Sequence, residues 1–94
     1  MRIVDSKLIE NCFEGTDIKE ILLDKEISKE FIFYLKGDSF MQYFPTFSKP
    51  FFKIDVRAKY IIKGIEGFKT LRIILKEKPE ELYKEFEKLV ENYE

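Results

Sequence analysis

The side chains that point most clearly to a chemical role are basic residues between positions 49 and 78. This segment carries nine Lys or Arg residues and three Asp or Glu residues, a net charge of +6, whereas the chain as a whole carries −1. Clusters of basic side chains can bind phosphate and other anions. One hypothesis is therefore an anion- or nucleic-acid-binding surface made of Lys53, Arg57, Lys59, Arg72 and Lys76. The competing interpretation is a solvated sheet face with long, flexible side chains.

Residue types that support catalysis or metal binding are scarce. The chain has no histidine and a single cysteine, Cys12, so the thiol lacks its usual activating base and no intrachain disulfide can form. The four glycines are isolated turn residues and do not form a phosphate-binding loop. The sequence therefore predicts a chain that is not an enzyme, binds no metal and uses no cofactor. The lone cysteine also favours a reducing, cytoplasmic location.

Aromatic side chains form a second candidate surface. Six of them fall between positions 40 and 52: Phe40, Tyr43, Phe44, Phe47, Phe51 and Phe52. Pro45 and Pro50 bound the loop in the middle of this segment, because proline cannot donate to a strand ladder. The segment holds more ring surface than one face of a hairpin can bury in a domain this small. We therefore expect a helix, a ligand or a second chain to cover part of it.

These two surfaces lead to two functional hypotheses. The favoured one is a protein-interaction or assembly module that uses the aromatic segment, either as a homo-oligomer or bound to a protein partner. The alternative is an RNA- or single-strand-binding module that uses the basic ribbon, residues 51–78. The longest apolar runs are about five residues, as in 31–35, too short to cross a membrane.

Alternating residues predict the strands that position the basic side chains. Residues 51–60 place Ile54, Val56, Ala58 and Tyr60 on one side and Lys53, Asp55, Arg57 and Lys59 on the other. Residues 68–76 alternate in the same way, and a period of two is typical of a strand with one wet face. If Gly64 and Gly67 close a hairpin between them, Tyr60 faces Leu71.

The same register makes specific predictions for the charged face. It places Val56 opposite Leu75 and Asp55 opposite Lys76, which is a favourable ion pair. It also places Lys59 opposite Arg72, and a bound anion would relieve the repulsion between these like charges.

The remaining elements follow from local signals. Residues 2–9 predict a strand, and Asp17 with Glu20 suggests a capped helix over 18–26. Residues 31–36 and 39–44 flank Gly37-Asp38 and favour an aromatic hairpin that is apolar on both faces. Alternatively, Ser28 caps a helix over 29–36 that ends at Gly37. Pro79 begins an amphipathic helix whose apolar stripe contains Leu82, Phe86, Leu89 and Tyr93.

Together these elements predict one α+β domain over residues 1–94. We expect an antiparallel meander of four to five strands in the order β-α-β-β-β-β-α, with the final helix packed on one sheet face. The bias toward Lys, Glu and Ile is compatible with a thermophilic origin or with an AT-rich genome.

Overall fold

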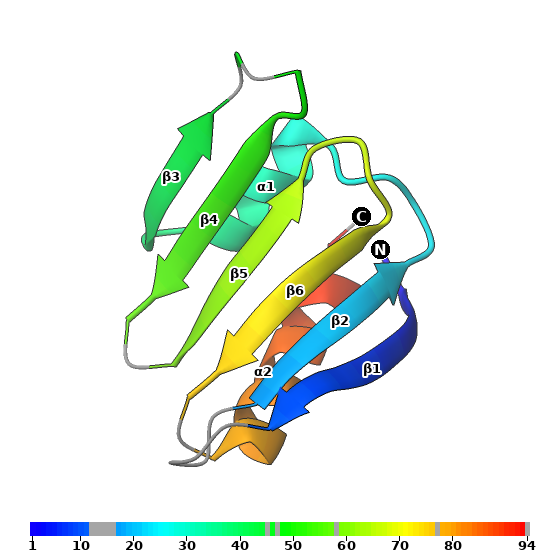
Figure 1. Ribbon diagram of the computed structural model, residues 1–94, viewed down its shortest axis with the longest axis vertical. Coiled ribbons are helices and arrows are strands. Elements are labelled where there is room, and N and C mark those ends of the chain that lie inside the picture. The colour runs from blue at the N-terminus through cyan, green and yellow to red at the C-terminus, as the bar shows by residue number, and fades with distance from the viewer. Residues whose placement is uncertain (12–16, 45, 47, 58, 77, 94) are drawn as a thin grey trace.

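A six-stranded antiparallel sheet forms the centre of the protein (Figure 1). The computed structural model describes residues 1–11, 17–44, 46, 48–57, 59–76 and 78–93. The strands are β1 (Ile3–Asn11), β2 (Asp17–Leu23), β3 (Phe40–Phe44), β4 (Phe51–Val56), β5 (Tyr60–Ile65) and β6 (Thr70–Leu75). They lie in the order β1-β2-β6-β5-β4-β3, so β2 and β6 are neighbours although they are far apart in the sequence.

Two helices cover one face of this sheet. Helix α1 (Lys29–Lys36) contacts β4, and helix α2 (Pro79–Glu91) contacts β1 and β6. In Figure 1 both helices lie behind the strands. The helices are linked to each other, since the Tyr34 hydroxyl donates a hydrogen bond to the Leu89 carbonyl at 2.6 Å and the Tyr93 ring lies 4.9 Å from the Tyr34 ring. The result is a two-layer α+β fold.

The hydrophobic core lies between the helices and the sheet. Its buried residues are Ile21, Leu23, Ile27, Phe31, Ile32, Leu35, Phe52, Ile54, Tyr60, Ile62, Leu71, Ile73, Leu75, Phe86 and Val90. Those on strands occupy alternate positions, because successive strand side chains point to opposite faces. Gly64 belongs to this arrangement, since a Cβ atom there would lie 2.9 Å from two ring carbons of Phe52.

Residues 29–36 form a helix, so the favoured strand and aromatic hairpin were wrong and the helical alternative is correct. The Ser28 side chain accepts a hydrogen bond from the Phe31 N–H at 3.1 Å, which caps the first turn. Gly37 ends the helix with a φ of +50°. These caps and the burial of one helix face outweigh the strand preference of the aromatic and β-branched residues. Strand β3 therefore pairs with β4 instead of with residues 31–36.

Residues 17–23 form strand β2, so the expected helix over 18–26 was also wrong. The strand pairs with β1 on one side and β6 on the other, and Ile21 and Leu23 are buried at alternate positions. A helix cap contributes only about 1 kcal/mol, and pairing with two neighbours plus burial of two large side chains exceeds it. Glu20, expected in the capping box, instead lies opposite Arg72.

The prediction of antiparallel strands within residues 51–76 is correct, but the predicted pairing between them is wrong. The expected strand 51–60 ends at Val56, and β4 pairs with β5 so that Val56 lies opposite Tyr60. Strand β5 then pairs with β6, and Tyr60 lies opposite Leu75, four residues from the expected partner Leu71. Residues 60–65 add a strand of their own. A shift of an even number of residues leaves every side chain on its original face, which is why the predicted core positions hold.

The order along the chain is therefore β-β-α-β-β-β-β-α with six strands, not β-α-β-β-β-β-α with four to five. The expected first strand and final helix are confirmed. Phe86 and Val90 of α2 are buried against the sheet. Ala58, part of the expected strand, lies outside the described residues.

Candidate functional site

The sheet face opposite the helices, here called the open face, carries no helix in the part of the chain that the structure describes (Figure 1). Strand register aligns its outward side chains into rows that run across the sheet. The middle row, called the charged row, contains Lys7, Glu20, Arg72, Lys63, Lys53 and Gln42 in the order of the strands. Three cations therefore lie side by side on β6, β5 and β4.

Apolar side chains flank the charged row on both sides. The isoleucine row contains Ile18, Ile74 and Ile61, and it continues through Asp55 to Phe40. On the other side, Leu22 lies opposite Thr70, while Ile65, Phe51 and Phe44 lie opposite one another. Phe40 is 69% exposed and Phe44 is 39% exposed. The open face thus presents large apolar groups at positions where an antiparallel sheet usually places polar ones.

The charges of the charged row are incompletely paired. Arg72 Nε lies 3.6 Å from Glu20 Oε2, an exposed ion pair. Lys53 and Lys63 lie opposite each other on neighbouring strands, and neither forms an ion pair with any described residue. Like charges directly opposite on neighbouring strands are destabilising. The middle of the open face therefore carries positive charge that the described residues do not neutralise.

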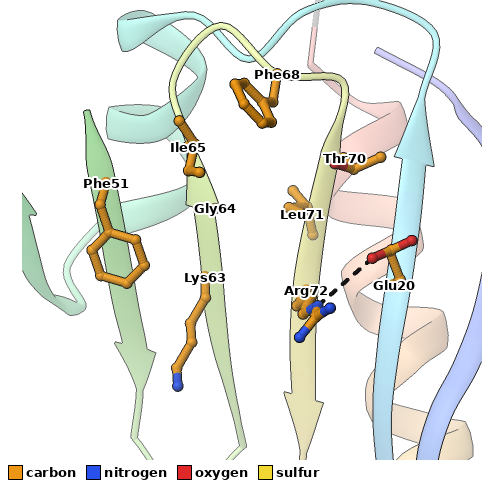
Figure 2. Close-up of a pocket in the computed structure, with 9 residues that line it drawn as sticks. All are labelled: Glu20, Phe51, Lys63, Gly64, Ile65, Phe68, Thr70, Leu71 and Arg72. Carbon is orange, nitrogen blue, oxygen red and sulfur yellow. Dashed lines mark ion pairs between the residues drawn. The ribbon is translucent and has the colours of Figure 1, made fainter. Parts of the chain in front are cut away.

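A shallow depression of about 360 Å³ opens on this face over β5 and β6. Figure 2 shows the Phe51 ring on one side and Phe68 at one end, with Lys63 and Arg72 toward the opposite end. Thr70, a small residue between larger neighbours, forms part of the wall. The depression combines apolar walls with two cations and one carboxylate, that of Glu20.

The six aromatic residues that the sequence singled out do not form one surface. Phe40, Phe44 and Phe51 lie on the open face, where the Phe44 and Phe51 rings stack with centroids 6.2 Å apart. Phe52 is buried in the core. Phe47 lies outside the described residues, as does Cys12.

Tyr43 faces the helix side of the sheet. Its ring packs edge-on against Phe33 of α1 at 6.1 Å, and its hydroxyl donates a hydrogen bond to the Glu66 carboxylate. This hydrogen bond raises the pKa of Tyr43, and partial desolvation and the Glu66 charge add to the effect. Tyr43 therefore helps to hold β3 against the turn between β5 and β6.

The five predicted basic contacts are also divided. Lys53, Arg72 and Lys76 lie on the open face. Lys76 Nζ lies 3.8 Å from Asp55 Oδ1, so the predicted ion pair forms. That distance exceeds a hydrogen bond, and this Asp55 oxygen is buried without a hydrogen bond among the described residues. The predicted opposite placement of Asp55 and Lys76 was wrong, because Asp55 lies opposite Ile61 and β5 separates β4 from β6.

The other two basic residues lie away from the charged row. Lys59 binds Glu85 of α2 at 2.6 Å, so the expected Lys59–Arg72 pair was wrong. Arg57 is exposed in the turn between β4 and β5. On β5 the residue opposite Arg72 is Lys63, which sequence reasoning missed. The sequence contains the pattern that would have identified Lys63, since it is the charged position between Ile61 and Ile65.

Comparisons with known proteins give no match from which a function could be transferred to this chain. No family model matches the chain, and no match is found among curated proteins or solved structures. Among the described residues, no helix is long and apolar enough to cross a membrane. The same residues contain no group of three or more His, Cys, Asp or Glu side chains placed to hold a metal ion.

Proposed function

We propose that this chain is a protein-interaction module, without catalytic activity, that binds its partner through the open face. The observation that carries the proposal is the pair of apolar rows on a sheet face that no described helix covers. Burial of apolar surface stabilises an association by about 25 cal/mol per Å². Apolar groups gathered on one face, with polar groups among them, are typical of a protein interface.

The isoleucine row supports this proposal most directly. Ile18, Ile74 and Ile61 are each half-buried by their neighbours, and they form a continuous strip across three strands. A solvated sheet face is expected to place polar residues at these positions. A strip of β-branched side chains instead provides a rigid apolar surface, because these side chains have few rotamers to lose on binding.

The alternative, nucleic-acid binding, draws support from the charged row. Three described carboxylates, Asp5, Glu20 and Asp55, share the open face with its cations. Protein–DNA interfaces are much more positively charged than protein–protein interfaces. The mixture of signs therefore favours a protein partner.

The proposal can be tested by changing the isoleucine row. Wild-type protein and an Ile74→Glu variant are immobilised, and the proteins that each captures from a lysate of the source cells are quantified. The matched control is Leu8→Glu, which places the same charge at an exposed apolar position on edge strand β1. We expect partners to be captured by wild type and by Leu8→Glu, and to be lost with Ile74→Glu.

Light scattering after size exclusion complements the capture experiment, because the capture experiment would miss a partner that is a second copy of this chain. A dimer that Ile74→Glu dissociates also supports an interface on the open face. A monomer whose captured proteins are the same for all three variants would contradict the proposal.

A further inference from the structure

We propose that the partner is an acidic segment of a different protein, with carboxylates over the row Lys53-Lys63-Arg72 and apolar side chains on the flanking rows. This inference rests on the proposed function, and it adds the chemistry of the partner. The three cations occupy directly opposite positions on β4, β5 and β6. Cβ atoms of directly opposite residues lie about 5 Å apart, so one carboxylate can contact two neighbouring cations.

The incomplete pairing of the three cations supports an acidic partner. Glu20 pairs with Arg72 alone, at 3.6 Å, and Lys53 and Lys63 have no ion pair among the described residues. A partner carboxylate between these lysines would replace their mutual repulsion with charge-assisted hydrogen bonds. Since the apolar rows on both sides would exclude water, these bonds would be stronger than on an open surface.

A second copy of the chain does not fit this charge pattern. Two sheets that stack in an aligned sandwich keep their strand directions within about 30°. The charged row of one copy would then lie over the charged row of the other. The row contains four cations, Lys7, Arg72, Lys63 and Lys53, and one carboxylate, Glu20. A two-fold axis along the row would place each cation over its own copy. A two-fold axis along the strands, through the middle of the sheet, would still place Arg72 over Lys63. Burial of such unpaired charges is costly.

Nucleic acid fits the apolar rows less well than a protein segment does. Bases bind single-strand sites by stacking on aromatic rings. Arg72 and Lys63 have the aliphatic side chains of Ile74 and Ile61 on one side, where bases find no ring to stack on. Phe51 and Phe68 supply rings only at the depression, on the other side of these cations. An acidic peptide can place its carboxylates over the cations and its apolar side chains over the isoleucines.

The depression indicates the spacing between apolar and acidic residues in the partner segment. The Phe51 ring lies near Lys63, and Phe68 lies at the end of the depression away from Lys63 and Arg72. Alternate residues of an extended peptide point to the same side and lie about 6.7 Å apart. A segment with an apolar residue two positions from an acidic one would place the first in the depression and the second over the cations. We therefore expect a partner motif in which apolar and acidic residues share one side.

The test uses a defined peptide probe. A twelve-residue peptide of three Phe-Ser-Glu-Ser repeats is titrated into isotopically labelled protein, and backbone amide chemical shifts are recorded by NMR. Peptides with Gln or Lys in place of Glu, and a twelve-nucleotide oligouridylate, are titrated in parallel. We expect the Glu peptide to shift amides of β4, β5 and β6. Its Kd should rise as salt rises, and the Lys peptide should not bind.

Charge variants identify the contact. We expect Lys63→Glu to weaken the Glu peptide at least tenfold and Lys63→Gln to weaken it less. Lys84→Glu is the matched control, since it makes the same change on the exposed surface of α2 and should leave the Kd unchanged. Retained amide dispersion in each variant shows that the fold is intact.

The outcomes separate this inference from the proposed function. If the Gln peptide binds the open face as tightly as the Glu peptide, the acidic chemistry is wrong but the interaction surface stands. Tighter binding of oligouridylate to these strands would replace the protein partner with nucleic acid. A dimer that Ile74→Glu dissociates would replace it with a second copy. Absence of any shift on β4, β5 and β6 with all probes overturns the inference.

Discussion

Lys63 on β5 lies directly opposite Arg72 on β6, and both side chains point to the sheet face away from the helices. Lys53 continues this line of cations on β4. Like charges in these positions reduce the stability of the free protein. This repulsion, flanked by apolar rows, is the basis on which we propose the open face as a binding surface.

The repulsion predicts that Lys63→Glu stabilises the free protein while it weakens binding. Glutamate at this position would face Arg72 on one side and Lys53 on the other. We expect the free energy of unfolding, measured by urea denaturation at low salt, to rise by about 0.5–1 kcal/mol. Added salt should stabilise wild type more than the variant, because it screens the repulsion. Lys84→Glu on α2 serves as the control, and an equal gain there would mean that net charge, not the row, is responsible.

The close approach of Gly64 to Phe52 predicts that Gly64→Ala is destabilising. The added Cβ would lie 2.9 Å from two Phe52 ring carbons, so the ring must move within a packed core. We expect a loss of about 1–3 kcal/mol in the free energy of unfolding, measured with urea.

A double-mutant cycle isolates the cause of that loss. In a Phe52→Leu background the clash is removed, so Gly64→Ala should cost clearly less than in wild type. Equal costs in the two backgrounds would show that the ring is not the obstacle.

The N-cap of α1 predicts a measurable loss for Ser28→Ala. The substitution removes the acceptor of the Phe31 N–H at the start of the helix. We expect the free energy of unfolding to fall by about 1 kcal/mol, with a loss of helical circular dichroism before the main transition. Ser48→Ala is the comparison, since Ser48 is exposed and does not cap a helix. If both variants lose the same stability, the cap is not responsible.

Tyr60 predicts a specific loss of stability at alkaline pH. Burial raises its pKa to about 12, and the nearby Glu85 charge adds to the effect. In the unfolded chain the pKa is about 10, so above pH 10 the folded state holds more protons and stability falls as pH rises.

Comparison with Tyr60→Phe measures this contribution. Between about pH 9 and pH 11.5, wild type should lose about 1–2 kcal/mol more of its free energy of unfolding than the variant. The other tyrosines, including Tyr43, are unchanged and cancel in the difference. Parallel curves for the two proteins would contradict the burial of the hydroxyl as the cause.

Local patterns in the sequence predicted the helices and strands in which buried side chains recur at a regular spacing. The apolar stripe after Pro79 predicted α2, and alternation predicted β4, β6 and the side chains they bury. Alternation also predicted that Lys53 and Arg72 share one face of the sheet, because the face of a strand residue is set by its position in the strand. The Asp55–Lys76 ion pair forms, but not between the paired strands from which it was predicted.

Tertiary structure alone decided which strands are neighbours and in which register they pair. Alternation fits equally well when Tyr60 faces Leu71 or Leu75, because an even shift keeps every side chain on its face. Only the added strand β5 and the turn near Gly67 select Leu75. That choice brings Lys63 beside Arg72, and the pairing of β2 with β6 overrides a helix-cap signal worth about 1 kcal/mol. The charged row exists because long-range pairing aligns residues that no local pattern connects.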